Sequence, residues 1–160
     1  MKQIINIILK IKHKSINLSK KIKPHITLVY PFEDFNQQDL IKHIENSIEG
    51  IKPFQITLKG LKKSAKDYYL YLLVSKGKNK IIKLHKKLNS GILKYVKNKD
   101  MPRYIPHITL GVFKSKKEIN SAMKNSLLKN QEYSTKVNSI QLLTLNKNNP
   151  IKSIKNFRLN

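Results

Sequence analysis

The sequence predicts an α+β fold with approximate two-fold internal symmetry, and two observations carry that prediction. The pentapeptide Pro-His-Ile-Thr-Leu occurs twice, at residues 24–28 and 106–110, about half of the 160-residue chain apart. Each copy also has the same surroundings: a strand-like run before it, a helical pattern after it and a further strand-like run after the helix. Self-similarity of this kind indicates a duplicated structural unit.

Three strand-like runs are predicted in the first half. Residues 3–11 are rich in Ile and favour a strand. Residues 13–23 form a short basic connection to the first motif, whose Pro24 suits the first position of a strand. After an intervening helix, residues 54–59 form a third strand.

The helix of the first half is predicted from apolar residues at helical spacing. Asn36 and Asp39 stand just before them, in an arrangement that caps a helix N-terminus. The apolar positions are Leu40, Ile41, Ile44 and Ile48.

The second half begins with a strand over residues 68–75, followed by a long amphipathic helix over residues 79–97. This helix takes the place of the short connection in the first half, and it leads to the second motif. The apolar face of the helix is formed by Ile81, Leu84, His85, Leu88 and Ile92.

A second capping pattern follows the second motif, because Ser115 and Glu118 match the S-x-x-E box that begins many helices. Residues 139–146 then form a strand, and residues 152–159 form a last strand at one sheet edge. The apolar positions of this helix are Ile119, Ala122, Met123 and Leu127.

The two halves are expected to pack together. No linker rich in Pro, Gly or Ser separates them. We therefore expect residues 1–160 to form one bilobal domain, with lobes built around residues 24–32 and 106–113.

The composition is strongly basic, with 33 Lys+Arg against 9 Asp+Glu and a formal net charge of +24. One explanation is a polyanionic partner, because a positive field attracts phosphate-bearing ligands. The other is an AT-rich genome, which enriches Lys, Ile and Asn whatever the function. The scarcity of acidic residues favours the first explanation.

Several function classes are excluded by what the sequence lacks. It has no Cys, which excludes disulfides, thiolate zinc sites and a cysteine nucleophile. None of its five Gly fits a phosphate-binding loop or a dinucleotide-binding fingerprint. No apolar stretch approaches the roughly 20 residues that span a bilayer. We expect a soluble, cytoplasmic protein that needs no cofactor and no obligate protein partner.

The two motifs carry the candidate chemistry. Residues two apart in a strand share a face, so His25 lies beside Thr27 and His107 beside Thr109, while the Ile and Leu between them pack into the core. A pseudo-two-fold axis would bring the two polar faces together across a groove. Two imidazoles and two hydroxyls would then surround one site.

This set of side chains suits phosphodiester chemistry without a metal. One neutral His accepts a proton from the attacking water or hydroxyl, and the other, protonated, donates to the departing oxygen. The Thr hydroxyls donate to non-bridging phosphate oxygens. A half-buried structural His explains a single His-x-Thr but not two matching copies. A metal site would need further ligands, which the sequence does not indicate.

At these residues the sequence resembles the two-histidine (2H) phosphoesterase superfamily, the group that contains bacterial 2′-5′ RNA ligases and RNA cyclic phosphodiesterases. Its signature is two H-x-[ST]-hydrophobic motifs, matched at residues 25–28 and 107–110. The run PHITLVYPF at residues 24–32 resembles small bacterial members. The resemblance implies a duplicated bilobal fold in which two mainly antiparallel sheets line a central groove, with helices on the outside.

The implied activity is hydrolysis of 2′,3′-cyclic phosphates or 2′-5′ phosphodiester bonds of RNA ends or small nucleotides. In that reading His25 and His107 are the acid and the base, and Thr27 and Thr109 bind phosphate. The assignment of the two roles between the His residues stays open. Two departures from the family weaken the choice of substrate: the short first connection, and Gly-Val-Phe at residues 111–113, where some members carry a basic residue.

Four further residues are candidates for substrate binding. Arg103 lies shortly before the second motif and could reach a phosphate. Tyr104 and Tyr30 flank the motifs and could line the groove. Phe113 shares a face with His107 if the strand stays regular, and could stack on a base.

The three remaining His are not expected to take part in catalysis. His85 is predicted to be a hydrogen-bonded core residue, because it lies on an apolar helix face. His13 and His43 are predicted to be solvated.

Two alternatives remain open beside the leading hypothesis. One keeps the site but makes the substrate a cyclic oligonucleotide signal. The other is a non-catalytic RNA-binding module in which the motif strands are only architecture; it predicts salt-sensitive RNA affinity without turnover.

Overall fold

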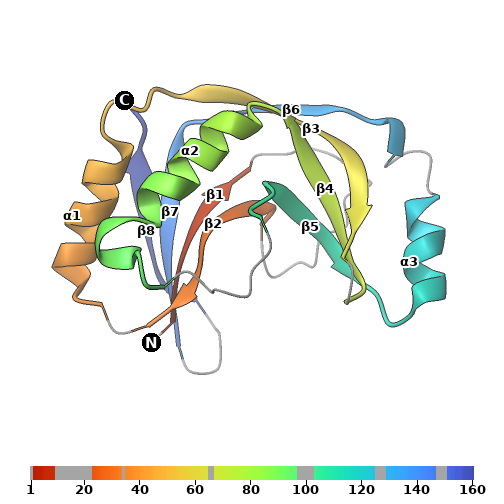
Figure 1. Ribbon diagram of the computed structural model, residues 1–160, viewed down its shortest axis with the longest axis horizontal. Helices are drawn as coiled ribbons and strands as arrows, with labels where there is room; N and C mark the ends of the chain where they lie inside the picture. Colours follow the sequence, from red (N-terminus) through yellow and green to blue (C-terminus); the bar gives the residue numbers. More distant parts are fainter. Residues whose placement is uncertain are drawn as a thin grey trace.

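The computed structural model describes residues 2–9, 23–33, 35–64, 67–96, 103–124, 129–146 and 151–160. These residues form two antiparallel four-stranded sheets and three α-helices (Figure 1). Sheet A has the order β2 (His25–Phe32), β1 (Lys2–Ile8), β7 (Ser139–Leu145) and β8 (Ile151–Arg158), and sheet B has the order β5 (His107–Val112), β4 (Tyr69–Lys76), β3 (Phe54–Lys63) and β6 (Tyr133–Val137).

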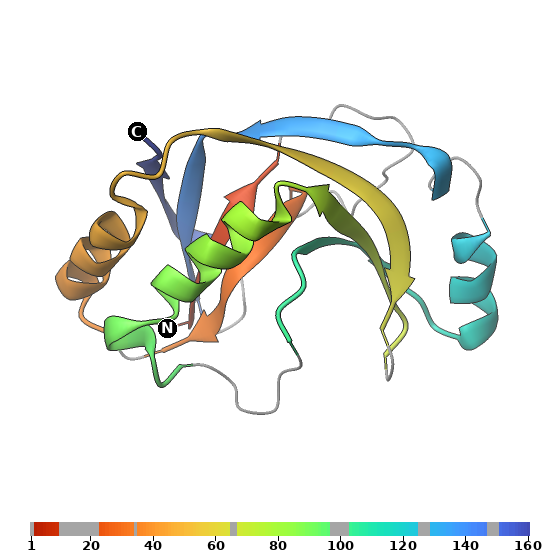
Figure 2. The same ribbon diagram turned by 45° about the horizontal axis from the view of Figure 1, so that its top comes forward.

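One helix lies at each end of the molecule, and the third lies between them against sheet A (Figure 1). Helices α1 (Gln37–Ile48) and α2 (Lys78–Leu88) contact each other, and α2 also packs on β2; a short 3₁₀ turn, η1 (Gly91–Leu93), follows α2. Helix α3 (Lys116–Met123) contacts β3 and β4 at the sheet B end (Figure 2). The predicted α+β class is confirmed.

The order of strands in the sheets shows the duplication. Each motif strand, β2 or β5, is an edge strand and pairs with the strand that precedes it in the sequence, β1 or β4. The strand that follows the first helix, β3, crosses to sheet B beside β4, and β7 crosses to sheet A beside β1. This exchange of strands ties the two halves of the chain to each other.

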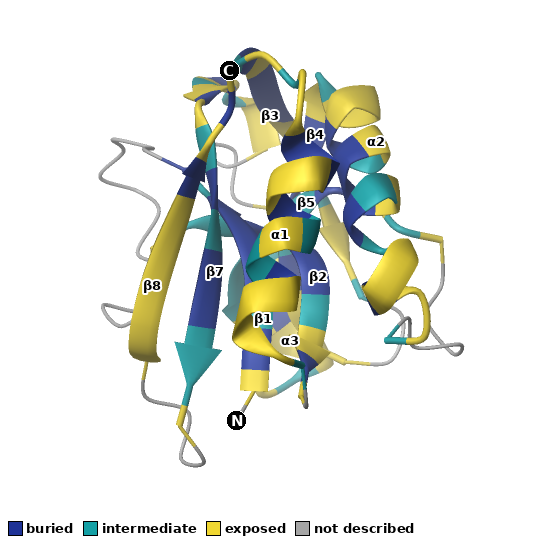
Figure 3. Ribbon diagram, turned by 90° about the vertical axis from the view of Figure 1, so that its left-hand side faces the viewer, coloured by how far each residue is buried: buried dark blue, intermediate teal, exposed yellow. Residues whose placement is uncertain are grey.

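Alternation along the motif strands places their apolar residues in the core. Ile26, Leu28 and Ile108 are at most 1% exposed, and they join one cluster that contains residues of both sheets and of the helices α1 and α2. In Figure 3 the inner strands are largely buried, whereas β8 at the sheet edge and the outer side of α1 are exposed. Burial of each of these side chains stabilises the fold by about 1.5–3 kcal/mol.

Both predicted helix caps are present. The Asn36 side chain accepts hydrogen bonds from the amides of Gln38 and Asp39 at the start of α1. At the start of α3, Ser115 Oγ accepts from the Glu118 amide, and Glu118 Oε2 accepts from the Lys114 amide. These bonds satisfy amides that have no partner within the helix.

The helix predicted over residues 79–97 ends early. Helix α2 stops at Leu88, because Asn89 donates its side-chain amide to the carbonyls of His85 and Leu28, and Gly91 turns the chain with a positive φ of 55°. In consequence Ile92, predicted to be buried, is 40% exposed, and Leu93 is buried instead.

One predicted strand needs correction, one strand was not predicted, and parts of other predictions lie outside the described residues. The third strand extends beyond residue 59 to Lys63, and β6 was not predicted. The last strand, β8, lies at the edge of sheet A as predicted. Residues 10–22, which include the first connection, and Leu127 fall outside the described part of the chain.

Gly77, which joins β4 to α2, provides a test of this fold. Its φ is 76°, and a Cβ there would lie 2.6 Å from the Gln55 carbonyl oxygen. We expect Gly77→Ala to lower the free energy of unfolding in urea by about 2 kcal/mol or more, because strain and a backbone clash add. Gly50→Ala is the matched control, since its φ is also positive but the space is open; it should cost only about 1 kcal/mol. Equal losses would contradict the close approach.

Candidate active site

The predicted motif residues occupy equivalent positions on the two edge strands. His25 is the first residue of β2 and Thr27 lies opposite Asn6 of β1, while His107 is the first residue of β5 and Thr109 lies opposite Tyr71 of β4. All four are half-buried, on the sheet face opposite the buried Ile and Leu. We call these two surfaces, one on each sheet, the motif faces.

Strands β2 and β5 lie beside each other in the middle of the molecule (Figure 1). The two imidazoles are close enough that the charge of His25 contributes to lowering the pKa of His107. The structure therefore brings the two halves of the predicted site together.

Each motif His has the same backbone partner. Nδ1 of His25 is 3.0 Å from the Lys23 carbonyl oxygen, and Nδ1 of His107 is 2.7 Å from the Ile105 carbonyl oxygen. A carbonyl only accepts, so Nδ1 carries the proton in both rings. In the neutral ring Nε2 is then the proton acceptor.

The approach to each motif is also repeated. The Pro24 carbonyl accepts from the Leu9 amide, and the Pro106 carbonyl accepts from the Val74 amide. Both Pro residues therefore join the preceding strand through the one backbone group that they have for pairing. This fixes the chain just before each His.

The surroundings of His107 favour its neutral form. Burial is the largest cause of its lowered pKa, and the charges of His25 and Lys62 add to it, against the hydrogen bond to Ile105, which acts in the opposite direction. The ring of Tyr71 packs on His107, with 4.2 Å between ring centroids.

Tyr30 lies on the motif face of sheet A because β2 contains an irregularity. The pairing shifts between Ile5 opposite Val29 and Asn6 opposite Thr27, which inserts Leu28 as an extra residue. Leu28 and Val29 are both buried, and Tyr30 is half-buried. Burial raises the pKa of Tyr30, which also interacts electrostatically with Tyr71 and Tyr104.

Tyr104 supports the first motif strand from the second half of the chain. Its hydroxyl donates to the Thr27 carbonyl oxygen at 2.9 Å, and its ring stacks on His85 with 3.7 Å between centroids. The ring is packed away, and burial raises the pKa of its hydroxyl. The structure gives Tyr104 a hydrogen bond to the motif backbone, and its role as a lining of the substrate groove stays a prediction.

His85 is buried and hydrogen-bonded, as predicted: its Nδ1 lies 2.7 Å from the Leu28 carbonyl oxygen. The prediction that His43 is solvated is wrong, because its Nε2 donates to the Leu88 carbonyl at 3.0 Å and joins α1 to the end of α2. His13 lies outside the described residues.

The remaining two candidates are Phe113, which lies on a different face from the motif residues, and Arg103. Strand β5 does not stay regular: Thr109 pairs with Tyr71 but Gly111 with Leu70, so Leu110 is an extra residue. This shift separates the face of Phe113 from that of Thr109, and the Phe113 ring lies beside Gly111. Arg103 is exposed, and its binding role stays a prediction.

Two neighbours of the site, Tyr71 and Lys62, were not singled out from the sequence. The alternation within residues 68–75 carried a signal for Tyr71, which faces the same side as its partner Thr109. Lys62 gave no usable signal, because it lies beyond the predicted end of its strand and is one of many Lys.

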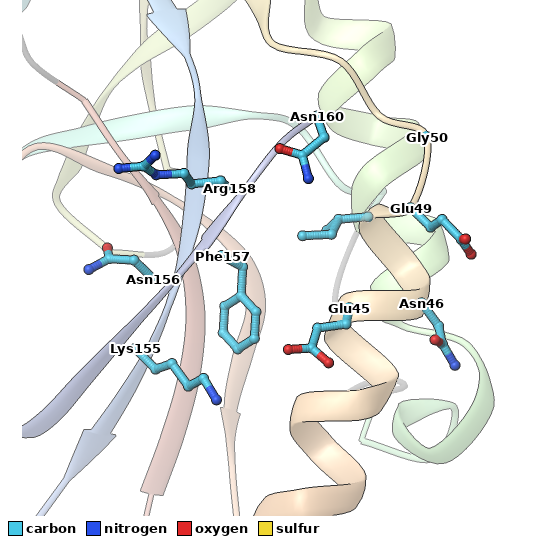
Figure 4. Close-up of a pocket in the computed structure, with 10 residues that line it drawn as sticks. Glu45, Asn46, Glu49, Gly50, Lys155, Asn156, Phe157, Arg158 and Asn160 are labelled. Carbon is cyan, nitrogen blue, oxygen red and sulfur yellow. The ribbon is translucent and has the colours of Figure 1, made fainter.

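A separate pocket of about 550 Å³ lies on the helix-covered side of sheet A. Figure 4 shows it between α1 and β8, where Phe157 and Lys155 point toward the helix and Arg158 and Asn156 point away. It contains none of the motif residues.

Two features are absent from the described part of the chain, a cluster of metal ligands and a membrane-spanning helix. No group of three or more His, Cys, Asp or Glu among the described residues could hold a metal ion. None of the described helices combines the length and the apolar character that crossing a bilayer requires.

Comparison with solved structures shows the same fold at low sequence identity. The Thermus thermophilus protein TT0787 aligns with a TM-score of 0.64 at 13% identity, over 99% of this chain and 98% of its own. Escherichia coli LigT in complex with NADP⁺ gives 0.62 at 14% identity, over 99% and 97%. Usb1 of Kluyveromyces marxianus gives 0.59 at 10% identity, over 99% and 98%.

No curated protein matches the sequence. The model of one protein family does match, over residues 4–149, and it is described as the 2′-5′ RNA ligase superfamily. The match includes both motif strands and the helices and strands between and after them up to β7, and it ends before β8. The chain therefore belongs to the 2′-5′ RNA ligase superfamily, the two-histidine phosphoesterases.

Proposed function

We propose that this protein is a metal-independent phosphoesterase that hydrolyses 2′,3′-cyclic phosphates or 2′-5′ phosphodiester bonds of RNA or small nucleotides. The observation that carries the proposal is the pair of equivalent imidazoles, each with Nδ1 bonded to the carbonyl two residues before it. Both rings thus keep Nε2 for proton transfer, which is what acid–base catalysis by two His requires.

Family membership and the fold support the same class of reaction. Structures of E. coli LigT hold NADP⁺, ATP, 3′-AMP and phosphate, which are nucleotides or their phosphate group. Phosphate-bearing ligands also suit a chain with a net charge of +24.

We assign the base to His107 and the acid to His25. A general base must be neutral, and the burial and positive neighbours of His107 hold its pKa below the ordinary value of 6.5. His107 Nε2 takes a proton from water as the oxygen of that water bonds to phosphorus. His25 Nε2 gives a proton to the ribose oxygen as its bond to phosphorus breaks.

The Thr hydroxyls complete the site. Thr27 and Thr109 share the motif faces with the two His, where each hydroxyl donates to a non-bridging phosphate oxygen. Their donation strengthens as negative charge grows on these oxygens in the transition state.

Substitution of either His tests the mechanism. We expect His25→Ala and His107→Ala each to lower kcat for a 2′,3′-cyclic nucleotide, assayed in EDTA, by about 100- to 10,000-fold, because each removes a proton-transfer group. His43→Ala, at the contact between α1 and α2, is the control and should keep most of the activity. Near-normal turnover in both motif variants would rule out paired His catalysis.

The pH dependence tests the assignment of the base. As pH falls, His107 becomes protonated and kcat/KM is lost; because its pKa is lowered, the acidic limb should lie below pH 6.5. The profile of kcat/KM between about pH 4.5 and 9 reports this apparent pKa for the free enzyme. An acidic limb above 6.5 would contradict the assignment of His107 as the base.

A further inference from the structure

The motif face of sheet B continues beyond the two motif residues. Along β4, Leu73 lies opposite His107, Tyr71 opposite Thr109 and Tyr69 opposite Val112. Residues that are directly opposite share a face, and the alternate residues of β4, Leu70, Leu72 and Val74, are buried on the other side. The face that carries His107 and Thr109 therefore extends past them to an aromatic side chain.

The two Tyr on this face differ in what they leave free. Tyr71 packs on His107 at 4.2 Å between centroids, and Tyr69 stacks on Tyr71 at 6.2 Å with an angle of 12° between the planes. Tyr71 thus has a ring on either side of it. Tyr69 is the last of these three rings and is 36% exposed, so its ring offers surface on which one more planar group can stack.

A positive charge stands in the same region. Lys62 of β3 lies directly opposite Tyr71, so Lys62, Tyr71 and Thr109 form one row across three strands. Its side chain is exposed. Among the described residues, no hydrogen bond or ion pair holds its ammonium group.

The next residue shows that this placement is specific. Lys63 lies opposite Leu70 on the other face, where its Nζ donates to Asn120 of α3 at 3.0 Å. The two adjacent Lys thus have different surroundings. Lys63 is hydrogen-bonded to α3, whereas Lys62, on the motif face, has no such bond among the described residues.

We propose that Tyr69 and Lys62 form a subsite for the nucleotide next to the one that carries the cleaved phosphate, so that the preferred substrate is the end of a single-stranded RNA rather than a free mononucleotide. Aromatic rings and ammonium groups are the two kinds of group that bind single strands without reading their sequence, by stacking on bases and by neutralising phosphates. This inference rests on the proposed phosphoesterase function.

The reach of the site explains why a second nucleotide is needed. A phosphate bound at His107 and Thr109 occupies two adjacent rows of β5, and Tyr69 lies one row further, a step of about 6.6 Å along a strand. The base of the nucleotide that carries this phosphate lies closest to the Tyr71 row. The base stacked on Tyr69 then belongs to the preceding nucleotide, on the 5′ side, and the phosphodiester that joins the two nucleotides falls within reach of Lys62.

The test compares two substrates in the same variants. We would measure kcat/KM for adenosine 2′,3′-cyclic phosphate and for the dinucleotide ApA ending in a 2′,3′-cyclic phosphate. Tyr69→Leu and Lys62→Gln should each lower the ratio of kcat/KM for the dinucleotide to kcat/KM for the mononucleotide about tenfold. Any effect of Lys62 on the protonation of His107 alters both rates alike, so the ratio of the two isolates the subsite.

The matched controls make the same chemical changes elsewhere. Lys63→Gln removes a charge from the other face of β3, and Tyr95→Leu removes an aromatic ring that is 88% exposed after η1. Neither variant should change the ratio of kcat/KM between the dinucleotide and the mononucleotide. The effect of Lys62→Gln should shrink in about 0.5 M salt, because it is electrostatic, while that of Tyr69→Leu persists.

The outcomes separate this inference from the proposed function. Suppose that the wild-type protein turns over both substrates. If both variants then leave the ratio of kcat/KM between the two substrates unchanged, because neither rate falls or both fall equally, the subsite is overturned and the proposed function is not. Absence of turnover on both substrates would overturn the proposed function. In that case the affinity for a fluorescein-labelled oligo(A) tetranucleotide decides the subsite: weaker binding in Tyr69→Leu and Lys62→Gln supports it, and unchanged binding overturns it.

Discussion

The pairing of each motif strand with the strand before it is the constraint on which the site depends. A sheet residue has only two faces available, so a slip of one residue would bury His25 and Thr27 and expose Ile26 and Leu28. The buried Ile and Leu therefore hold the register by the free energy of their burial. The same device acts on β5, where Ile108 is buried beneath His107. The geometry of the candidate site follows in this sense from core packing.

The edge position of β2 leaves backbone groups to be satisfied, and the protein uses them to join its two halves. Where Leu28 is inserted as an extra residue, the carbonyls of Thr27 and Leu28 accept from the side chains of Tyr104, His85 and Asn89. A buried carbonyl without a partner would cost about 1–3 kcal/mol. All three donors come from the segment that leads from β4 to the second motif, so the connection before β5 also holds the first motif in place.

The parts of the fold and site that were predictable are those set by local pattern. Alternation within five residues was enough to place His25 beside Thr27, and cap residues such as Asn36 and Ser115 indicated where their helices begin. The early end of α2 depended on Gly91 and on a bond from Asn89 to a distant strand. Such a bond is tertiary and leaves no periodic trace in the sequence.

The neighbours of the site were missed for a related reason. Tyr71 meets His107, and Lys62 meets Tyr71, only through the register between strands that are far apart in the sequence. The strand of Lys62 was also predicted to stop at residue 59, whereas the positive φ of Gly60, 90°, lies within an irregular stretch of pairing through which β3 continues. A composition with 33 basic residues hides any single Lys that matters.

Positive charge near the candidate site has two effects, and both support the proposed chemistry. Under the proposed function, positive neighbours such as Lys62 attract a phosphate, and they add to burial in holding the pKa of His107 low, which suits the imidazole to accept a proton. In the proposed mechanism the opposite imidazole, that of His25, donates its proton when the ribose oxygen departs. In that mechanism one positive field both attracts the substrate and helps to keep the proposed base, His107, neutral.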